Sequence, residues 1–228
     1  QDKTVSIPRA GGGISAENGA KSEEPGTADG FELSYRIDPQ EAEISQIVIE
    51  REARILGQYA ARSARWGGSK AGWQAAWKRY YRVIYRDNYK RLEPLARSLE
   101  QHFSQQQTPR SQIPRMLLEW LQGFRYVRVP TLSDLSSPVS ALLERRGDCD
   151  SLGLIYTILL KHMDYDTILL VSRRYSHALA GVVTEGKGAR YRFEGEDYLL
   201  AELTEAVPLG RIPADMADPS GWLAVPLP

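Results

Sequence analysis

The sequence has few of the residues that build disulfides or metal clusters. Among 228 residues there is one cysteine, Cys149, and there are three histidines. A single cysteine excludes an intramolecular disulfide and a cysteine-rich zinc site. Asp148 and Asp150 flank it, but no second group of ligands accompanies them, so we interpret Asp148 as a helix cap and expect no metal and no cofactor. Cys149 is then either a small buried side chain or a reactive thiol.

A long apolar run and an excess of one charge are also missing. The longest apolar stretch, residues 152–160, is about half of the roughly 20 residues that a membrane-spanning helix needs, so we expect no transmembrane segment. The 29 basic and 29 acidic side chains give no indication of a specific nucleic-acid partner. The chain begins at Gln1 rather than Met, which favours a periplasmic or secreted protein whose leader has been removed.

The charges that are present are unevenly distributed. Residues 1–50 carry 4 basic and 10 acidic groups, residues 51–104 carry 12 and 4, and residues 105–228 carry 13 and 15. The basic middle region has two interpretations. It is a solvated helical face whose arginine stems lie on apolar surface, or it is a docking face for an acidic polymer, a lipid headgroup or an acidic protein partner.

Composition and periodicity divide the chain into three regions. Residues 1–30 are rich in Gly, Ala, Ser and Glu without apolar periodicity, which predicts a disordered lead-in. Residues 31–108 form an N-terminal helical arm: a strand over 31–37, a helix over 39–66, and a second helix that begins after Ser69 and ends near 103. Residues 109–228 form the remaining domain. Its predicted elements are a helix over 114–123, a strand over 124–129, a short turn of helix over 139–143, a buried helix from Cys149, strands over 167–172, 177–183, 190–194 and 198–203, and an extended tail over 221–228. One buried helix followed by antiparallel strands is an α+β pattern.

The second arm helix has an aromatic side chain at every fourth position: Trp73, Trp77, Tyr81, Tyr85 and Tyr89. We expect this stripe to pack against the first arm helix, with the first three side chains mostly buried, because an exposed patch of that size is unusual for a monomer. A substrate groove or a partner face is the alternative.

The basic side chains of the arm are expected largely on its solvated side: Arg62, Arg65, Lys78, Arg79, Arg82, Arg86, Lys90 and Arg91. The arm has no ionisable group suited to acyl-transfer chemistry. We therefore expect it to influence access or partner choice without changing the reactivity of the thiol.

Cys149 follows a good N-cap residue, Asp148, and so lies in the first turn of the buried helix. The positive end of the helix dipole favours thiolate, which predicts a lowered thiol pKa. The free N–H groups of the same turn, including that of Cys149, point to where an oxyanion would form. A thiol in this position is suited to nucleophilic attack on a carbonyl, provided that a base is near.

His177 is the most suitable base. His102 lies near the end of the aromatic helix, and His162 ends the Cys149 helix about 20 Å from the thiol. His177 opens a predicted strand, and Glu202 lies in the next-but-one strand of an expected antiparallel meander. We expect the sheet to bring the two side chains side by side, so that the acid orients the imidazole. Three further acids lie near Glu202 in sequence and are alternatives: Glu194, Glu196 and Glu205.

The order of these residues resembles that of the transglutaminase-like superfamily, and of its bacterial cysteine proteases more than the calcium-dependent animal cross-linking enzymes. The motifs that carry the resemblance are Phe124-x-Tyr126, Pro138, Gly147-Asp148-Cys149-Asp150-Ser151, Leu159-Leu160, Tyr175-Ser176-His177-Ala178 and Tyr198-Leu199-Leu200-Ala201-Glu202-Leu203-Thr204. They cover a little under half of the chain, from about residue 118 to 222. Residues 1–108 match no pattern we can name.

The resemblance implies a papain-like α+β fold with Cys149, His177 and Glu202 as a catalytic triad. It also implies that Tyr126 donates a hydrogen bond in the oxyanion hole, although packing of a strand explains this residue equally well. The sequence departs from the family pattern twice. Glu202 stands where Asp is common, and Asp164 stands where the helix often ends in Gly; both residue types can serve in these positions.

These features predict a cysteine acyl-transfer enzyme. Cys149 attacks an amide carbonyl, His177 protonates the leaving amine, and Glu202 stabilises the imidazolium. Water or an amine then resolves the thioester, and peptides, isopeptides or cell-wall peptides are the expected substrates. Two alternatives stay open: a non-catalytic peptide-binding module, and an interaction protein that uses the basic aromatic arm.

Overall fold

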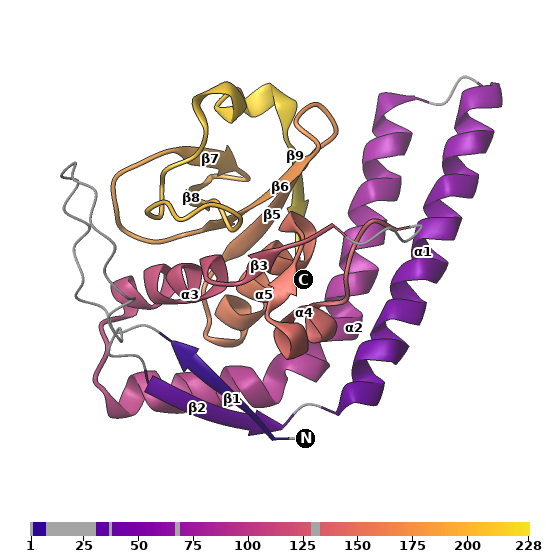
Figure 1. The fold of residues 1–228 in the computed structure, drawn as a ribbon. Coiled ribbons are helices and arrows are strands. Elements are labelled where there is room, and N and C mark those ends of the chain that lie inside the picture. Colours follow the sequence, from indigo (N-terminus) through magenta and orange to yellow (C-terminus); the bar gives the residue numbers. More distant parts are fainter. Residues whose placement is uncertain (1, 8–30, 37, 67–68, 129–132) are drawn as a thin grey trace, which may run out of the picture.

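The N-terminal arm is a hairpin of two long helices that stands beside the rest of the molecule (Figure 1). The computed structural model describes residues 2–7, 31–36, 38–66 and 69–228 except 129–132. The helices are α1 (Pro39–Trp66) and α2 (Lys70–Gln105). Ser69 caps α2 as predicted, because its hydroxyl accepts a hydrogen bond from the Gly72 N–H at 3.1 Å.

A two-stranded sheet lies at the lower end of this hairpin (Figure 1). It pairs β1 (Asp2–Ile7) with β2 (Phe31–Arg36) in antiparallel register, Asp2 opposite Arg36. The β2 strand confirms the sequence prediction. The prediction of a disordered lead-in is wrong for residues 2–7, where Val5 and Ile7 favour an extended backbone that finds its partner more than twenty residues later. Residues 8–30 lie outside the described part of the chain.

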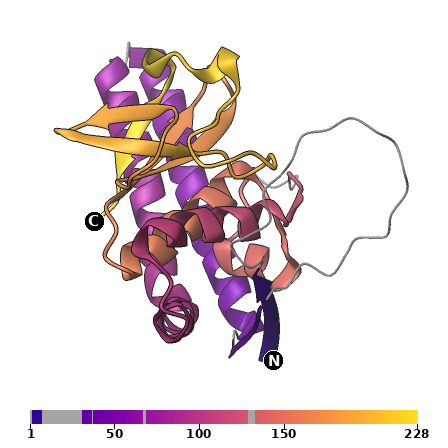
Figure 2. The ribbon, with the colours of Figure 1, turned by 90° about the vertical axis from the view of Figure 1, so that its left-hand side faces the viewer.

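The second half of the chain combines helices with a five-stranded antiparallel sheet, which confirms the α+β class. The helices are α3 (Ile113–Gln122), α4 (Pro138–Glu144) and α5 (Cys149–His162), and three short 3₁₀ turns are η1 (Arg110–Gln112), η2 (Ala214–Met216) and η3 (Pro219–Gly221). The strands are β5 (Thr167–Ser172), β6 (His177–Val182), β7 (Arg190–Phe193), β8 (Glu196–Ala201) and β9 (Leu223–Pro226), in the order β7-β8-β6-β5-β9. Figure 2 shows the sheet in front of the arm helices.

The strand expected over residues 124–129 is much shorter in the structure. Only β3 (Arg125–Tyr126) is extended and paired, and it lies parallel to β4 (Arg146–Gly147) outside the five-stranded sheet. Both β3 side chains are exposed, so the alternation in the sequence does not mark a buried face. This small ladder brings the segment before residue 129 next to the start of α5.

The core does not divide at residue 108, where composition changes. Helix α5 is buried along nearly its whole length and contacts both α2 and β6. Leu92 and Leu99 of α2 belong to the same apolar cluster as Leu152 and Ile155 of α5. The predicted boundary therefore separates two kinds of sequence that share one hydrophobic core.

The aromatic stripe of α2 meets two different environments. Tyr81 and Tyr85 are buried, and Trp73 and Trp77 are mostly buried with part of each side chain exposed, which confirms the expectation for the first three side chains. The tryptophans keep some exposed surface because a four-residue repeat advances about 40° per step and wraps around the helix. The first turns of α2 therefore face different neighbours from the later ones.

The basic residues of the arm are partly used within the fold. Arg62, Arg79, Arg86 and Lys90 are exposed, while Lys78, Arg82 and Arg91 are half-buried; the Arg65 side chain lies outside the described residues. Arg79 pairs with the buried Glu52 at 2.5 Å, and the Arg82 Nε donates to the Pro226 carbonyl at 2.9 Å. Of the helices whose residues are described, none combines the length and the apolar character that crossing a membrane requires.

Candidate active site

Cys149 is the first residue of α5, and its position depends on the buried Asp148 carboxylate. One Asp148 oxygen accepts the Ser151 N–H at 2.8 Å. The other accepts the Ser136 N–H at 2.8 Å and the Ser151 hydroxyl at 2.7 Å. The predicted N-cap is thus confirmed, and the same carboxylate ties the helix start to the loop before α4. Both oxygens of the Asp148 carboxylate thus accept hydrogen bonds from protein donors.

His177 and Glu202 meet across neighbouring strands. His177 opens β6, Glu202 follows the last residue of β8, and the register places Ala180 opposite Ala201. The His177 Nε2 lies 2.7 Å from the Glu202 Oε2, and the glutamate side chain is 1% exposed. The predicted contact between these two residues is therefore present.

The Glu202 carboxylate is held by further donors. The backbone N–H and the hydroxyl of Thr204 donate to its Oε1 at 2.8 and 2.7 Å, and the Gln122 amide of α3 donates to its backbone carbonyl at 2.8 Å. Burial raises the pKa of Glu202, but the hydrogen bonds from His177 and Thr204 outweigh burial and lower that pKa. An ionised Glu202 accepts a hydrogen bond from the Nε2–H of a neutral His177, which leaves Nδ1 free to act as a base.

The thiol lies next to the start of β6. The backbone N–H of Ala178, the residue after His177, lies near enough to the Cys149 sulfur to lower the pKa of the thiol. Burial raises the pKa of the Cys149 thiol, and the carboxylates of Asp150 and Asp148 raise it further. The Ala178 N–H and Arg128 lower the pKa of the thiol, but by less than burial and the two carboxylates raise it. The expected lowering of this pKa is therefore wrong, because burial and two adjacent acids outweigh the helix dipole.

Asp150 links the thiol to the arm. Its Oδ2 lies 3.8 Å from the Cys149 sulfur, and its Oδ1 accepts a hydrogen bond from the Tyr81 hydroxyl at 2.7 Å. Burial and the neighbouring Asp148 raise the pKa of Asp150 to about 6, against the opposing effect of Tyr81 and His177. The arm, which we expected to leave the reactivity of the thiol unchanged, therefore contributes Tyr81 to the surroundings of the sulfur.

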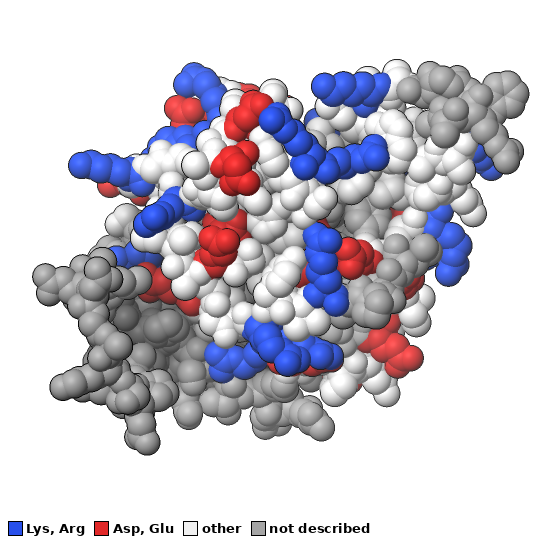
Figure 3. All heavy atoms as spheres, turned by 45° about the horizontal axis from the view of Figure 1, so that its top comes forward, with Lys and Arg blue, Asp and Glu red and all other residues white. Residues whose placement is uncertain are grey.

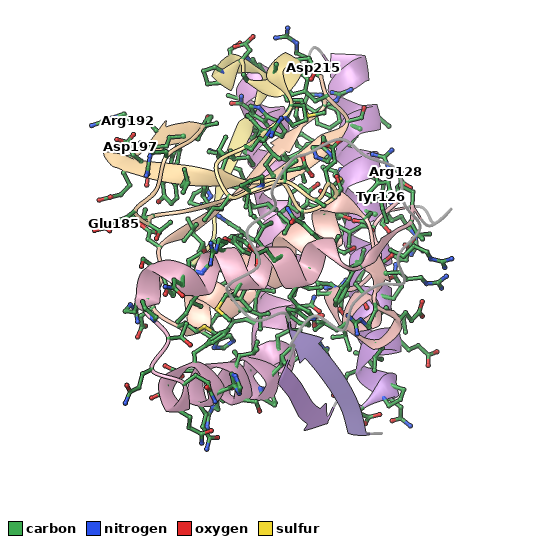
Figure 4. The ribbon with its side chains drawn as sticks, turned by 60° about the vertical axis from the view of Figure 1, so that its left-hand side comes forward. Tyr126, Arg128, Glu185, Arg192, Asp197 and Asp215 are labelled. Atoms are coloured by element: carbon green, nitrogen blue, oxygen red, sulfur yellow. The ribbon has the colours of Figure 1, made fainter. Side chains whose placement is uncertain are left out.

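Arg128 organises the opposite edge of the site. Figure 4 shows Arg128 and Tyr126 together at one edge of the molecule. The Arg128 Nε donates to the Tyr126 hydroxyl at 3.2 Å, and its Nη2 donates to the Ser176 carbonyl, just before His177, at 2.8 Å. Burial raises the pKa of Tyr126 while Arg128 lowers it, with a net rise. Tyr126 is 44% exposed, and no described residue accepts its proton.

A cavity of about 500 Å³ opens beside these residues. Asp150 and His177 line one end of it, and Trp73, Trp77 and Arg173 line the other. A second cavity of about 490 Å³ shares both tryptophans and Arg173. The half-buried tryptophans of the arm thus border the space next to the candidate base, as the groove interpretation of the stripe required.

The other candidate residues lie elsewhere. His162 stacks on Tyr89 with ring centroids 3.8 Å apart, at the far end of α5, and His102 lies near the end of α2. Glu194, Glu196 and Glu205 are exposed, so Glu202 alone of the four acids reaches His177. Within the described residues, no three His, Cys, Asp or Glu side chains gather as metal ligands.

Sequence reasoning assigned no role in the candidate active site to Arg128, Asp150 or Tyr81. The position of Arg128 two residues after Tyr126 and that of Asp150 next to Cys149 were signals that could have found them. Tyr81 gave none, because 69 residues separate it from Asp150. Comparisons of this chain with known protein families, with curated proteins and with solved structures give no match.

Proposed function

We propose that the protein is a cysteine acyl-transfer enzyme that hydrolyses amide bonds in peptides or proteins. The observation that supports this best is the 2.7 Å contact between the His177 Nε2 and the buried Glu202, next to a thiol that the Ala178 N–H contacts. A base, an acid that orients it and an adjacent nucleophile form the general arrangement for covalent catalysis. The resemblance to the transglutaminase-like superfamily, with its papain-like core, points the same way.

In this mechanism the thiol is neutral at rest. As its sulfur attacks the amide carbon, the proton moves to the His177 Nδ1, and the carbonyl electrons form an oxyanion. The N–H groups at the start of α5 and the Tyr126 hydroxyl are the proposed donors to that oxyanion. His177 then protonates the leaving amine, the C–N bond breaks, and a thioester remains. His177 then takes a proton from water, whose oxygen attacks the thioester carbonyl. The C–S bond breaks, the acid is released, and the proton passes from His177 to the sulfur.

Asp150 has two opposite effects in this scheme. Its charge disfavours a free thiolate, but the same charge attracts the imidazolium that forms when His177 takes the proton. Once the sulfur is bonded to carbon, the negative charge lies on the oxyanion, where the proposed N–H and hydroxyl donors stabilise it, and the sulfur beside Asp150 is neutral. The favourable effect persists while His177 holds the proton. Asp150 therefore favours the covalent intermediate over the unreacted ion pair.

The test uses the full chain and a defined peptide library, with mass spectrometry of the products and hydroxylamine to trap the thioester as a hydroxamate. We expect cleavage by the wild-type protein and at least about a 10³-fold loss in Cys149→Ala and in His177→Ala. His102→Gln, a change of a histidine outside the site, should retain the wild-type rate. Cleavage that persists in Cys149→Ala would overturn the proposal, as would a wild-type protein that cleaves no peptide.

One observation favours a second candidate, a peptide-binding module without catalysis. The raised pKa of Cys149 suits a thiol that stays protonated. In that case the wild-type protein would bind library peptides and release them unchanged, and Cys149→Ala would bind them equally. A basic arm that binds an acidic partner and a periplasmic or secreted location remain proposals from the sequence.

A further inference from the structure

The two cavities beside the site adjoin each other, and together they are called the groove. Both are lined by Trp73, Trp77, Val171 and Arg173. The inner end reaches Asp150 and His177, and the outer end reaches Lys70 and Trp222. A chain lying in this groove would run from the start of α2 to the candidate base. Its walls come from the arm on one side and from the β5–β6 turn on the other.

The wall from the arm is aromatic. Trp73 packs edge-on against Tyr59 with ring centroids 6.3 Å apart, and Trp77 lies 5.9 Å from Tyr81. The Arg173 guanidinium lies 5.1 Å from the centre of the Trp73 ring. The Arg173 guanidinium therefore covers one side of the Trp73 ring, and this contact holds the guanidinium beside the groove. An apolar side chain of a ligand would bury further tryptophan surface here.

The outer part of the groove is positively charged. Its cations are Lys70, Arg173 and Arg174, and no acidic side chain of the described residues lines it. Arg174 is neutralised by Asp218 at 2.6 Å, whereas Lys70 and Arg173 have no carboxylate partner within the described chain. In Figure 3 basic side chains run across the upper part of the molecule, towards the tops of the arm helices.

The inner part of the groove has a different balance. Arg128 lies 3.5 Å from Asp134, and Asp150 is bonded to Tyr81 at 2.7 Å. The positive charge without a carboxylate partner among the described residues thus comes from Lys70 at the outer end and from Arg173 where the two parts of the groove meet, beside the aromatic wall. A nucleic acid is normally bound by a basic groove that follows many phosphates. A polypeptide with one or two carboxylates next to an apolar residue fits this short basic site better.

We propose that this groove binds an extended acidic peptide segment, with a carboxylate on Arg173 and Lys70 and an apolar side chain against Trp73 and Trp77. This deepens the proposed function, on which it rests, by naming the class of substrate: an acidic, apolar-containing polypeptide whose scissile amide lies next to Cys149. The segment on the outer side of that amide carries the acidic residues.

Binding can be measured without cleavage in the Cys149→Ala background of the full chain. The probes are fluorescein-labelled nonapeptides with one Phe flanked by Glu, the same peptide with Gln for each Glu, and a labelled oligo-dT of nine nucleotides. Fluorescence anisotropy at low salt should give an affinity for the Glu peptide about 10-fold above that for the Gln peptide. Raising the salt should reduce this difference.

Variants locate the interaction. Arg173→Gln and Lys70→Gln should each weaken the Glu peptide about 3- to 10-fold and leave the Gln peptide unchanged. Trp73→Ala should weaken both peptides. Arg192→Gln is the matched control, because Arg192 is exposed, pairs with Asp197 at 3.3 Å and lies at the opposite end of the molecule from Arg128 (Figure 4).

Equal affinity for the two peptides, tighter binding of oligo-dT, or insensitivity to Arg173→Gln would each overturn the groove proposal. These outcomes are separable from failure of the enzyme proposal. If the wild-type protein cleaves peptides regardless of their charge, the acyl-transfer function stands and the groove proposal fails. If the Glu peptide binds through Arg173 but is never cleaved, the groove stands and the enzyme proposal fails.

Discussion

The two walls of the candidate site, the strands that carry His177 and Glu202 and the start of α5, have opposite effects on the pKa of their acidic groups. On the sheet side, hydrogen bonds from His177 and Thr204 lower the pKa of Glu202 despite its burial. On the helix side, burial and mutual repulsion raise the pKa of Cys149 and that of Asp150. The sheet wall thus stabilises a negative charge, whereas the helix wall destabilises one. This difference favours a neutral thiol beside an ionised Glu202.

The largest expected effect comes from removing the charge on the sheet wall. Glu202→Gln keeps the size of the side chain but loses the carboxylate that orients His177 and stabilises its protonated form. We expect peptide hydrolysis to fall by about 10²- to 10⁴-fold, measured as kcat/KM on a cleaved library peptide. Glu205→Gln, an exposed acid three residues later, is the control. A loss below threefold in Glu202→Gln would show that Glu202 is structural.

Removing a charge from the helix wall should make the thiol easier to ionise, in contrast to the loss of activity expected for the sheet wall. Asp150→Asn retains an acceptor for Tyr81 but eliminates the carboxylate 3.8 Å from the sulfur. The pKa of Cys149 should fall by about 1 to 3 units, so iodoacetamide should label the thiol at a lower pH than in the wild type. Asp215→Asn, on an exposed residue far from Tyr126 (Figure 4), should not shift the labelling profile. An unchanged profile in Asp150→Asn would contradict the comparison.

A smaller effect should appear in the pH dependence of stability. The folded pKa of Asp150, about 6, lies above its unfolded value, so its contribution is present below about pH 4 and is lost as pH rises towards 6. Glu202 has a lowered folded pKa, so its contribution is present above its unfolded pKa and is lost on acidification. Urea denaturation between pH 3.5 and 7 should show that Asp150→Asn gains stability relative to the wild type as pH rises through 4 to 6, by on the order of 2 kcal/mol. A constant difference across this range would argue against a raised pKa for Asp150.

The parts of the structure that follow from local pattern were predictable. Apolar spacing located α1, α2 and α5, and it located the strands that carry His177 and Glu202. The order of the strands was not predicted, because a meander would place β7 between β6 and β8, whereas β8 pairs directly with β6. The direction of the Cys149 pKa was not predictable, because the helix dipole is a local feature while burial and the approach of Asp150 depend on the whole fold. The same reason hid Tyr81, whose contact with Asp150 exists only because α2 packs on α5. The strand over residues 2–7 was missed because its partner is distant in sequence.

In helix α2, residues spaced four apart contribute to three different features of the structure. Trp73 and Trp77 border the groove, Tyr81 holds Asp150, and Tyr85 enters the shared core. Inserting or deleting a single residue within this stretch would rotate everything on one side of the change by about 100° relative to the other. The residues that line the groove, bond Asp150 and pack in the core would then all be misplaced relative to their partners. Changes in length should therefore be tolerated only at the ends of this helix, and the arm can diverge by substitution but not by insertion between residues 73 and 85.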